Sequence, residues 1–370
     1  MRNLKQLARD AAHSWLKLTK RIKSARDFNN GVHIYAENFS FTYDPLPLRP
    51  PQYYLPDAEH ASFLKNFVEN PNIHAYSGVV VVADNVYVSV PSMLHKSENT
   101  VFLEGILDTE MTLAYPKKLW SVETIQLKKT IKKSPAILLA LPLFTNYYHW
   151  LIEILPRLML IDESKDLSGI PLLVPAEAPQ YVAETLRLAG LTHRVQYLAS
   201  GTYNFSTLYI PSALSPPSHP SSFSVNWIRD RLQKDLQEQH LGTKRRVYVS
   251  RRDAPIRFTT NETELLVLLK KYNFECVVLS EMTVAEQIQT FSNAEFIISN
   301  HGAGLTNLAF CQADTKVIEL FVQGWFTNAF YHIGLIRNLH YGFMVCPRVG
   351  NGQYVAPEKL EVIIQAALQG

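Results

Sequence analysis

Three polar side chains lie along one face of an otherwise apolar segment, Thr145 to Ile161. Asn146, His149 and Glu153 are separated by three and then four residues, which places them on the same side of a helix. A carboxylate one turn beyond an imidazole can fix the ring tautomer and raise its basicity, as a general base for a hydroxyl group requires. The spacing therefore predicts a proton-accepting pair, His149 and Glu153, with Asn146 beside it. A satisfied polar pair in the protein interior is the alternative.

A second candidate site is the glycine-containing turn from Ile298 to Asn307, which follows an apolar strand and precedes an apolar helix. Gly302 and Gly304 allow the backbone to approach a ligand closely, and the start of the helix offers unpaired N–H groups to a phosphate. His301 can add a hydrogen bond or a charge. A turn that needs glycine for its geometry alone is the alternative. Because Asn307 replaces the third glycine, the turn is not a dinucleotide-binding fingerprint.

Charged side chains follow two further strands of the same half of the chain. Arg251, Arg252 and Arg257 come directly after an apolar strand that ends near Ser250. The guanidinium group suits bidentate contact with phosphate and stays charged when desolvated. Glu319, at the end of a later strand, could accept hydrogen bonds from two ribose hydroxyls. The alternative for the arginines is an ordinary solvated loop. The alternative for Glu319 is a solvated or capping carboxylate.

These residues must be positioned by a regular succession of strands and helices. From Pro135 onwards, apolar strands alternate with helical segments, and the rhythm repeats after a Pro- and Ser-rich stretch from Pro211 to Ser222. This pattern predicts an α/β protein with two doubly wound, Rossmann-like domains, whose strand ends we expect to face a shared cleft. Pro156 removes one intrahelical hydrogen bond, so we expect the helix that carries His149 to bend near its middle.

The N-terminal part of the chain has a different character. Residues 1–27 carry eight Lys or Arg against two Asp, with apolar residues on one helical stripe, which predicts a basic amphipathic helix. Such a helix could bind an anionic membrane surface or pack on the protein itself. Further on, the pattern is rich in strands, and the run from Tyr76 to Val90 predicts a hairpin around Ala83 to Asn85.

The expected organisation has three parts. They are a basic amphipathic helix at 1–30, a first α/β domain with a β-rich elaboration at 31–220, and a second α/β domain at 221–370. The last helix, Pro357 to Gln369, could pack back on the first α/β domain.

Composition narrows the class of protein. The chain of 370 residues is 47% apolar and 19% charged, which is ordinary for a soluble protein with two cores. A net charge of +3 gives no reason to expect nucleic acid. The three cysteines match no zinc spacing or disulfide framework, and no apolar run approaches the ~20 residues that cross a bilayer. We therefore expect a cytoplasmic protein, in peripheral contact with the inner membrane face if the basic helix binds lipid.

Four ordered motifs, within about Ala136 to Phe321, resemble glycosyltransferase family 61, whose bacterial members often belong to capsular and exopolysaccharide biosynthesis. They are "NYYHWLIEILPRL", "RRVYVSRRDAPIRFTTNETEL", "NHGAGLTNLAFC" and "VIELF". The resemblance implies a GT-B architecture of two facing Rossmann-like domains. It also implies inverting transfer of a hexose or pentose from a nucleotide-sugar, UDP-linked in characterised relatives, to a hydroxyl group of a glycan.

Carried over by residue, the resemblance implies that the C-terminal domain binds the donor and the N-terminal domain presents the acceptor. Arg251 and the turn would hold the diphosphate, Glu319 would contact the ribose, and His149 with Glu153 would lie on the acceptor side. Arg257 follows Arg251 as a donor-binding residue, and Asn146 joins the acceptor side. The turn comprises His301, Gly302, Ala303, Gly304, Leu305 and Thr306.

Other enzyme classes lack their motifs here. The chain has neither the full dinucleotide fingerprint of a nucleotide-sugar dehydrogenase nor the G-x-S-x-G of a serine hydrolase. It also has no Asp-x-Asp pair, the usual carrier of a divalent ion beside a nucleotide-sugar, so we expect neither a metal nor another cofactor. A non-catalytic module that binds a nucleotide-sugar or a glycan is the alternative function, and Trp325 and Phe326 are candidates for stacking on a sugar ring.

Overall fold

The computed structural model describes residues 22–23, 32–42, 50–56, 59–60, 63–64, 67, 75–96, 101–102, 130–162, 165–215, 217–236 and 244–369. The chain divides into two compact units: unit 1 comprises Met1–Thr42 and Ala75–Pro217, and unit 2 comprises Tyr43–His74 and Ser218–Gly370. The segment 43–74, which the sequence interpretation placed in the first domain, is thus part of unit 2. No helix among the described residues is long and apolar enough to cross a membrane.

The predicted N-terminal helix lies outside the described residues, except at Ile22–Lys23. These two residues form a short strand, β1, which pairs in parallel with β5 (Val101–Phe102). The association of this region with a membrane therefore stays a prediction.

Unit 1 contains a mixed sheet of order β2-β3-β10-β7-β8-β9, with β4 beside β3 and β6 beside β10. Pairs β2–β3 and β3–β10 are antiparallel, whereas β10–β7, β7–β8 and β8–β9 are parallel. The strands are β2 (Val32–Thr42), β3 (Ala75–Val90), β4 (Leu94–Lys96), β6 (Thr130–Lys133), β7 (Ala136–Leu138), β8 (Leu172–Pro175), β9 (Val195–Leu198) and β10 (Gly201–Pro211).

The hairpin predicted around Ala83 to Asn85 is wrong, because β3 runs through this position as one strand of 16 residues. Asn85 does adopt a left-handed backbone conformation, with φ of 52°, which is typical of turns. However, β10 pairs with β3 on both sides of Asn85, from Val80 to Val90. Pairing with a neighbouring strand therefore overrides the local turn signal.

The helical segment predicted to carry His149 is present, but its winding changes along its length. It begins as a π-helix, η4 (His149–Ile154), continues as a 3₁₀-helix, η5 (Leu155–Leu158), and ends as an α-helix, α5 (Met159–Asp162). Pro156 lies in the 3₁₀ part, where its missing N–H is consistent with the loss of regular α-helical bonding. Unit 1 also contains η6 (Lys165–Leu167), α6 (Gln180–Leu188) and η7 (Thr192–Arg194).

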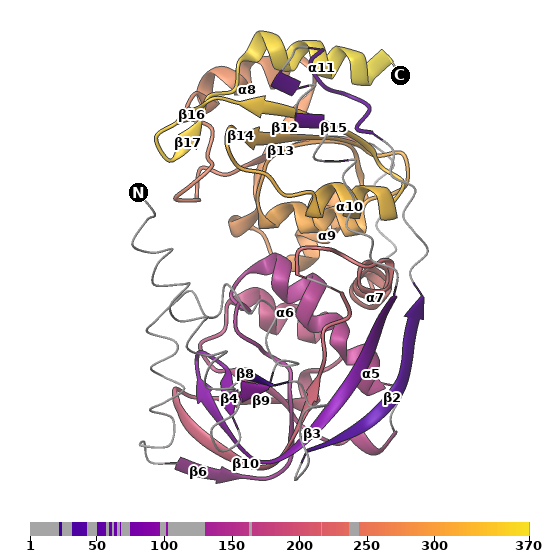
Figure 1. Cartoon of the computed structure of the whole chain (residues 1–370). Coiled ribbons are helices and arrows are strands. Elements are labelled where there is room, and N and C mark those ends of the chain that lie inside the picture. The colour runs from indigo at the N-terminus through magenta and orange to yellow at the C-terminus, as the bar shows by residue number, and fades with distance from the viewer. Residues whose placement is uncertain are drawn as a thin grey trace, which may run out of the picture. The chain divides into compact units, whose positions relative to one another are not determined.

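Unit 2 is a doubly wound α/β unit, as the strand and helix rhythm predicted. Its sheet is parallel throughout, in the order β12-β11-β13-β14-β15. Helices α8 and α11 cover one face of this sheet, and α9 and α10 cover the other (Figure 1). The strands are β11 (Arg245–Ser250), β12 (Phe274–Val278), β13 (Ala294–Asn300), β14 (Lys316–Val322) and β15 (His340–Cys346). The helices are α7 (Ser222–Gln233), α8 (Glu262–Lys271), η8 (Leu279–Glu281), α9 (Val284–Ser292), η9 (Ala303–Phe310), α10 (Ala329–Ile336) and α11 (Pro357–Gln369).

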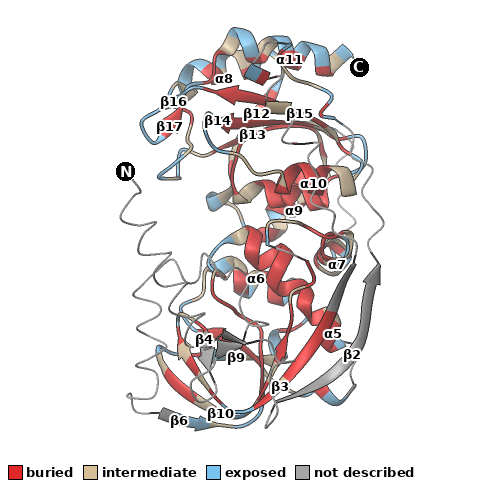
Figure 2. Cartoon of the chain, viewed as in Figure 1, coloured by how far each residue is buried: buried red, intermediate tan, exposed pale blue. Residues whose placement is uncertain are grey.

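The core of unit 2 explains the place of the last helix. Leu360, Ile363 and Ile364 of α11 are buried against the sheet together with Leu265 and Leu269 of α8, and Figure 2 shows this inner side of α11 as buried. The apolar face of the last helix is thus used within unit 2, rather than packed back on the first domain as the sequence suggested.

The segment 43–74 extends unit 2 at the free edge of β15. The Tyr341 carbonyl accepts a hydrogen bond from Gln52 N at 2.7 Å, and the Tyr53 carbonyl accepts one from Phe343 N at 2.8 Å. Phe67 is fully buried, and its ring lies 5.0 Å from those of Tyr331 and Phe343. Gln52 and Tyr53 of the Pro- and Tyr-rich passage therefore cover an edge strand that would otherwise expose its hydrogen-bonding groups.

Candidate functional site

The strand order of unit 2 marks one place at its sheet edge for a ligand. From β11 the chain passes to β12 on one side, and it then returns to β13 on the other side. In open α/β sheets, ligands bind beyond the carboxyl ends of the strands at such a reversal. The loop that begins with Arg251 follows β11, and His301 follows β13, so the sheet brings both predicted donor-binding segments to this point.

Arg251 begins the loop and lies against the glycine turn. A Cβ atom added to Gly302 would lie only 1.8 Å from Nη1 of Arg251, so a side chain at residue 302 would displace the guanidinium group. Burial lowers the pKa of Arg251, and the nearby charge of Asp253 opposes this shift. Nε of Arg251 is buried and has no hydrogen-bond partner among the described residues. The absence of a side chain at Gly302 therefore allows the close approach of a cation to the backbone of the turn.

Arg257 is held at the same sheet edge in a strained backbone conformation. Its φ is 59°, in the left-handed region that non-glycine residues rarely adopt. Its N–H donates to the Asn351 carbonyl at 2.6 Å, and its own carbonyl accepts from Nδ2 of Asn300 at 3.1 Å. Such strain persists only where the surroundings impose it, and it is concentrated at functional sites.

The guanidinium group of Arg257 lies over an aromatic ring. Its Cζ is 4.5 Å from the centroid of the Trp325 ring, a cation–π geometry. Burial lowers the pKa of Arg257 to about 10, with the charge of Arg251 acting in the same direction, although Glu319 opposes the shift. Nε of Arg257 is also buried without a partner among the described residues. Two desolvated guanidinium groups thus lie close together, each with an unused donor.

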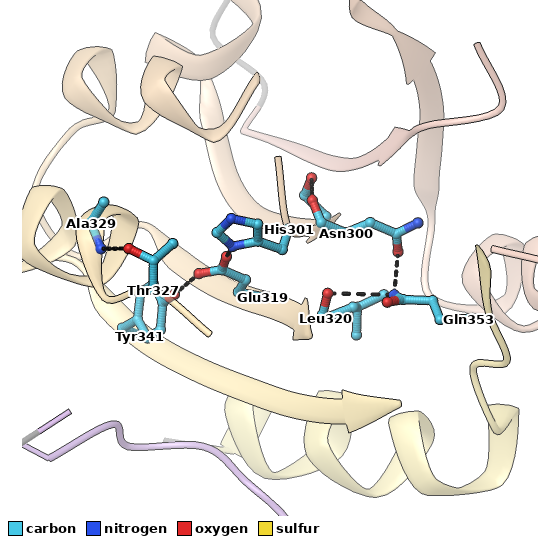
Figure 3. A network of polar contacts seen from close by, with 9 residues as sticks. Asn300, His301, Glu319, Leu320, Thr327, Ala329, Tyr341 and Gln353 are labelled. Atoms are coloured by element: carbon cyan, nitrogen blue, oxygen red, sulfur yellow. Dashed lines mark hydrogen bonds and ion pairs between the residues drawn. The ribbon is translucent and has the colours of Figure 1, made fainter. Parts of the chain in front are cut away.

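His301 forms the third element of this cluster and is fixed from behind. Its Nδ1 contacts one carboxylate oxygen of Glu319, and the hydroxyl of Tyr341 donates to the other (Figure 3). Burial lowers the pKa of His301, and the charges of Arg257 and Arg251 add to this effect, whereas Glu319 opposes it. Because a carboxylate only accepts hydrogen bonds, Nδ1 of the neutral ring carries the proton and Nε2 keeps its lone pair.

The geometry gives Glu319 a supporting position. Its side chain is fully buried, and its two oxygens are engaged by His301 and Tyr341. Burial, followed by the charge of Glu319, raises the pKa of Tyr341 well above its usual range, so the phenol remains a donor. In this arrangement Glu319 orients the imidazole, whereas the predicted contact with ribose hydroxyls would require a carboxylate oxygen to change partner.

The remaining residues of the predicted turn differ in their surroundings. A Cβ added to Gly304 would meet Cδ1 of Leu279 at 2.6 Å, so this glycine is required for packing. Leu305 is buried, and its N–H is used within the turn by the Gly302 carbonyl at 2.9 Å. Ala303 is half-buried, whereas Thr306 is fully buried and its hydroxyl has no partner among the described residues. The predicted helix after the turn is a 3₁₀-helix, η9.

The predicted proton-accepting pair lies in unit 1. Nδ1 of His149 is 2.6 Å from Oε2 of Glu153, and both side chains are largely buried. Asn146 is exposed, and its Oδ1 accepts from the backbone N–H of Tyr148 at 2.9 Å, so it caps the start of the helix. Arg157, one turn further on, is buried and donates to the Glu153 carbonyl and the Pro211 carbonyl. The carboxylate again leaves Nε2 of the histidine as the proton acceptor.

Several residues that shape the unit 2 site were not predicted. Asn300 bonds to the Arg257 carbonyl and to Thr259, and Gln353 reaches Oδ1 of Asn300 at 3.1 Å (Figure 3). Trp325, a candidate for stacking on a sugar ring, contacts Arg257 and His301, and Phe326, the other candidate, packs on Phe67. Their contact with a sugar stays a prediction. No local pattern marks Gln353 or Tyr341, because their partners, Asn300 and Glu319, lie on other strands of the tertiary structure.

Among the residues that the structure describes, no group of three His, Cys, Asp or Glu side chains is arranged to hold a metal ion. The expectation that turnover needs no metal stays a prediction.

Comparisons with known proteins complete the description of the site. No curated protein matches the chain. Among solved structures, a similar one is the E. coli heptosyltransferase WaaC with ADP, at 13% sequence identity and a TM-score of 0.33, over 64% of this chain and 98% of that chain. Residues 147–318 match the family model described as Glycosyltransferase 61. The matched segment includes His149, Arg251 and His301, so the part of the chain that carries these residues is similar to glycosyltransferase family 61.

Proposed function

We propose that this glycosyltransferase transfers a hexose or pentose, with inversion and without a metal, from a UDP-linked sugar to a hydroxyl group of a glycan in capsular or exopolysaccharide synthesis. The observation that carries the proposal is the pair of desolvated guanidinium groups of Arg251 and Arg257 at the strand reversal of unit 2, each with an Nε donor that no described residue uses.

The donor part of the proposal follows from charge. Two like charges that are partly removed from water are unfavourable, as the lowered pKa values of Arg251 and Arg257 indicate. A diphosphate would supply two negative charges and many acceptor oxygens to the unused donors. The absence of a side chain at Gly302 lets the guanidinium group of Arg251 lie against the backbone of the turn, where such a contact would form.

The reaction needs one base and stabilisation of one leaving group. An acceptor hydroxyl oxygen forms a bond to the anomeric carbon, while the bond from that carbon to the diphosphate oxygen breaks. Nε2 of His149 accepts the hydroxyl proton, since Nδ1 is directed to Glu153. The electron pair of the broken bond stays on the diphosphate, where Arg251 and Arg257 stabilise the charge. The two arginines thus stabilise the charge that a divalent ion stabilises in other transferases.

Two substitutions separate the proposed roles. His149→Ala is expected to lower kcat by about 10²- to 10⁴-fold, the usual effect of a lost general base, with little change in the Kd for UDP. Arg251→Ala is expected to weaken UDP binding by about 1.5 to 3 kcal/mol, the range for a charge-assisted hydrogen bond. Isothermal titration with UDP and release of UDP from a panel of UDP-sugars measure the two effects.

A matched control is Lys270→Gln, which removes one exposed charge at the far end of α8. This substitution should change neither kcat nor the Kd for UDP. If His149→Ala lost UDP binding and Arg251→Ala lost only turnover, the assignment of roles would be reversed. Clear binding of UDP-sugars without turnover on any glycan acceptor would instead favour the non-catalytic module.

A further inference from the structure

The short hairpin of β16 (Arg348–Val349) and β17 (Gly352–Gln353) lies beyond the segment that matches the family model, yet it is joined to the arginine loop. Three backbone hydrogen bonds connect the two. Arg257 N donates to the Asn351 carbonyl at 2.6 Å, Gln353 N to the Phe258 carbonyl at 2.9 Å, and Thr260 N to the Gln353 carbonyl at 2.9 Å. The hairpin therefore holds the backbone at Arg257 and directly after it.

Gly352 sets the distance between hairpin and loop. A Cβ added to this residue would lie 2.7 Å from the Phe258 carbonyl oxygen and 2.9 Å from Cγ2 of Thr260. The first of these is a backbone atom, so a side chain could be accommodated only by a shift of the loop itself. The close approach seen here thus requires glycine at residue 352.

The side chain of Gln353 completes the restraint. It is fully buried, and its Nε2 donates to Oδ1 of Asn300 at 3.1 Å (Figure 3). Nδ2 of Asn300 in turn donates to the carbonyl of Arg257 at 3.1 Å. The hairpin therefore reaches Arg257 by two routes, one through the backbone and one through Asn300, which also precedes His301.

Arg348 brings a further guanidinium group to this region. It is exposed, and its Nη2 donates to the Gln323 carbonyl at 3.3 Å, two residues before Trp325. The ring of Trp325 lies against the guanidinium group of Arg257. The charge of Arg348 contributes to the lowered pKa of Arg257, which agrees with this proximity.

We infer that the hairpin Arg348–Gln353 is a working part of the donor-phosphate site. Its backbone fixes Arg257, and Arg348 is a third cation that binds the donor phosphates alongside Arg251 and Arg257. This inference rests on the proposed function, because it names additional residues for the same diphosphate.

The contribution of Arg348 is tested by charge removal. The probes are UDP and inorganic pyrophosphate, titrated calorimetrically into the full-length protein at several salt concentrations. Arg348→Gln is expected to weaken both probes about tenfold, the lower range for a lost charged hydrogen bond at an exposed position, and to reduce the salt dependence of Kd. Lys270→Gln, which removes an exposed charge elsewhere in unit 2, should bind both probes as the wild type does.

The positioning role is tested by a double-mutant cycle. Gly352→Ala is expected to weaken pyrophosphate binding about tenfold or more when Arg257 is present. In the background of Arg257→Gln, the same glycine substitution should have little further effect, because the hairpin acts through that arginine. A merely structural role would instead give equal losses in both backgrounds. Thermal unfolding of each variant shows whether the fold is retained, and if Gly352→Ala does not fold, Arg348→Gln alone decides.

The outcomes separate the two proposals. If the wild-type protein binds neither UDP nor pyrophosphate, the proposed function fails, and this inference fails with it. If the wild type binds both, and both Arg348→Gln and Gly352→Ala bind them equally well, only the role of the hairpin is refuted. Additive losses in the cycle would refute the action of Gly352 through Arg257.

Discussion

At the scale of single residues, the unit 2 site contains two features that destabilise the ligand-free protein, and a bound ligand can offset them. Arg251 and Arg257 are partly desolvated beside each other, and Arg257 has a strained φ of 59°. Neither feature favours the folded protein alone, since like charges repel and left-handed backbone costs about 1 to 3 kcal/mol. A bound anion would lower the electrostatic cost. Under the proposed function, the residues are arranged for the complex with an anion rather than for stability.

The clearest residue-scale test of this arrangement is Gly302→Ala. Because the new Cβ would lie 1.8 Å from Nη1 of Arg251, the flexible guanidinium group must move away. We expect UDP to bind at least about tenfold more weakly, with a nearly unchanged thermal midpoint, as for the loss of one charge-assisted contact. Titration calorimetry and thermal unfolding measure the two quantities. The matched control is Gly169→Ala, where the added Cβ meets no atom within 4 Å; unchanged UDP affinity in Gly302→Ala would contradict the prediction.

The residue scale also shows what sequence reasoning can reach. The contact of His149 with Glu153 was predictable, because a spacing of four residues on one helix is a local geometry. The contact of Glu319 with Tyr341 was not, because it depends on two parallel strands lying side by side. Gly302 was singled out, but its reason, the approach of Arg251, requires the order of β11 and β13 in the sheet.

At the scale of elements, the sequence encodes those strands and helices that are long enough to show a period. The alternation in unit 2 predicted β11 to β14 and the helices between them, because each buried strand is apolar and each helix has one apolar face. The strands of the hairpin, β16 and β17, have two residues each and carry no such period. At Asn85 a local turn signal was outweighed by pairing with β10.

An element-scale prediction concerns α10, which carries His332. Burial lowers the pKa of His332 from 6.5 to about 4, and the charge of His219 adds to this effect. Above pH 6.5 His332 is neutral in both the folded and the unfolded protein, so this residue does not reduce the free energy of unfolding. As the pH falls towards 4, only the unfolded chain gains the proton, and the free energy of unfolding decreases by up to about 3 kcal/mol.

The variant His332→Gln cannot take up this proton. Its free energy of unfolding should therefore decrease less than that of the wild type between pH 7 and pH 4.5, although the other histidines titrate in both proteins. Urea unfolding at the two pH values, followed by tryptophan fluorescence, gives the difference. If the free energy of unfolding decreased equally in both proteins, the burial of His332 in α10 would not lower its pKa.

At the scale of the whole molecule, the chain order does not follow the two compact units. Residues 43–74 lie between two parts of unit 1 in the sequence, but they belong to unit 2. Sequence patterns gave no sign of this, because an extended Pro-rich passage satisfies its backbone wherever an open strand edge is available. Here Gln52 and Tyr53 of this passage lie along β15, which also carries Tyr341, the partner of Glu319. The proposed donor site thus depends on an edge strand that is covered by residues nearly 300 positions away in the sequence.

This connectivity predicts how a fragment of 218–370 behaves. Without residues 43–74, the N–H groups of Phe343 and Val345 lose their partners, the Tyr53 carbonyl and Nε2 of His60. The apolar surface that Phe67 covers is also exposed to water, at a cost of roughly 1.5 to 3 kcal/mol for one phenylalanine. We expect the fragment to unfold at a markedly lower temperature than unit 2 in the full chain, and a synthetic peptide of residues 43–74 to raise its thermal midpoint in a concentration-dependent way. A peptide with Phe67→Ala should do so less effectively. A fragment that unfolds at the same temperature with and without the peptide would show that β15, and with it the support for Tyr341 and Glu319, is stable without the inserted segment.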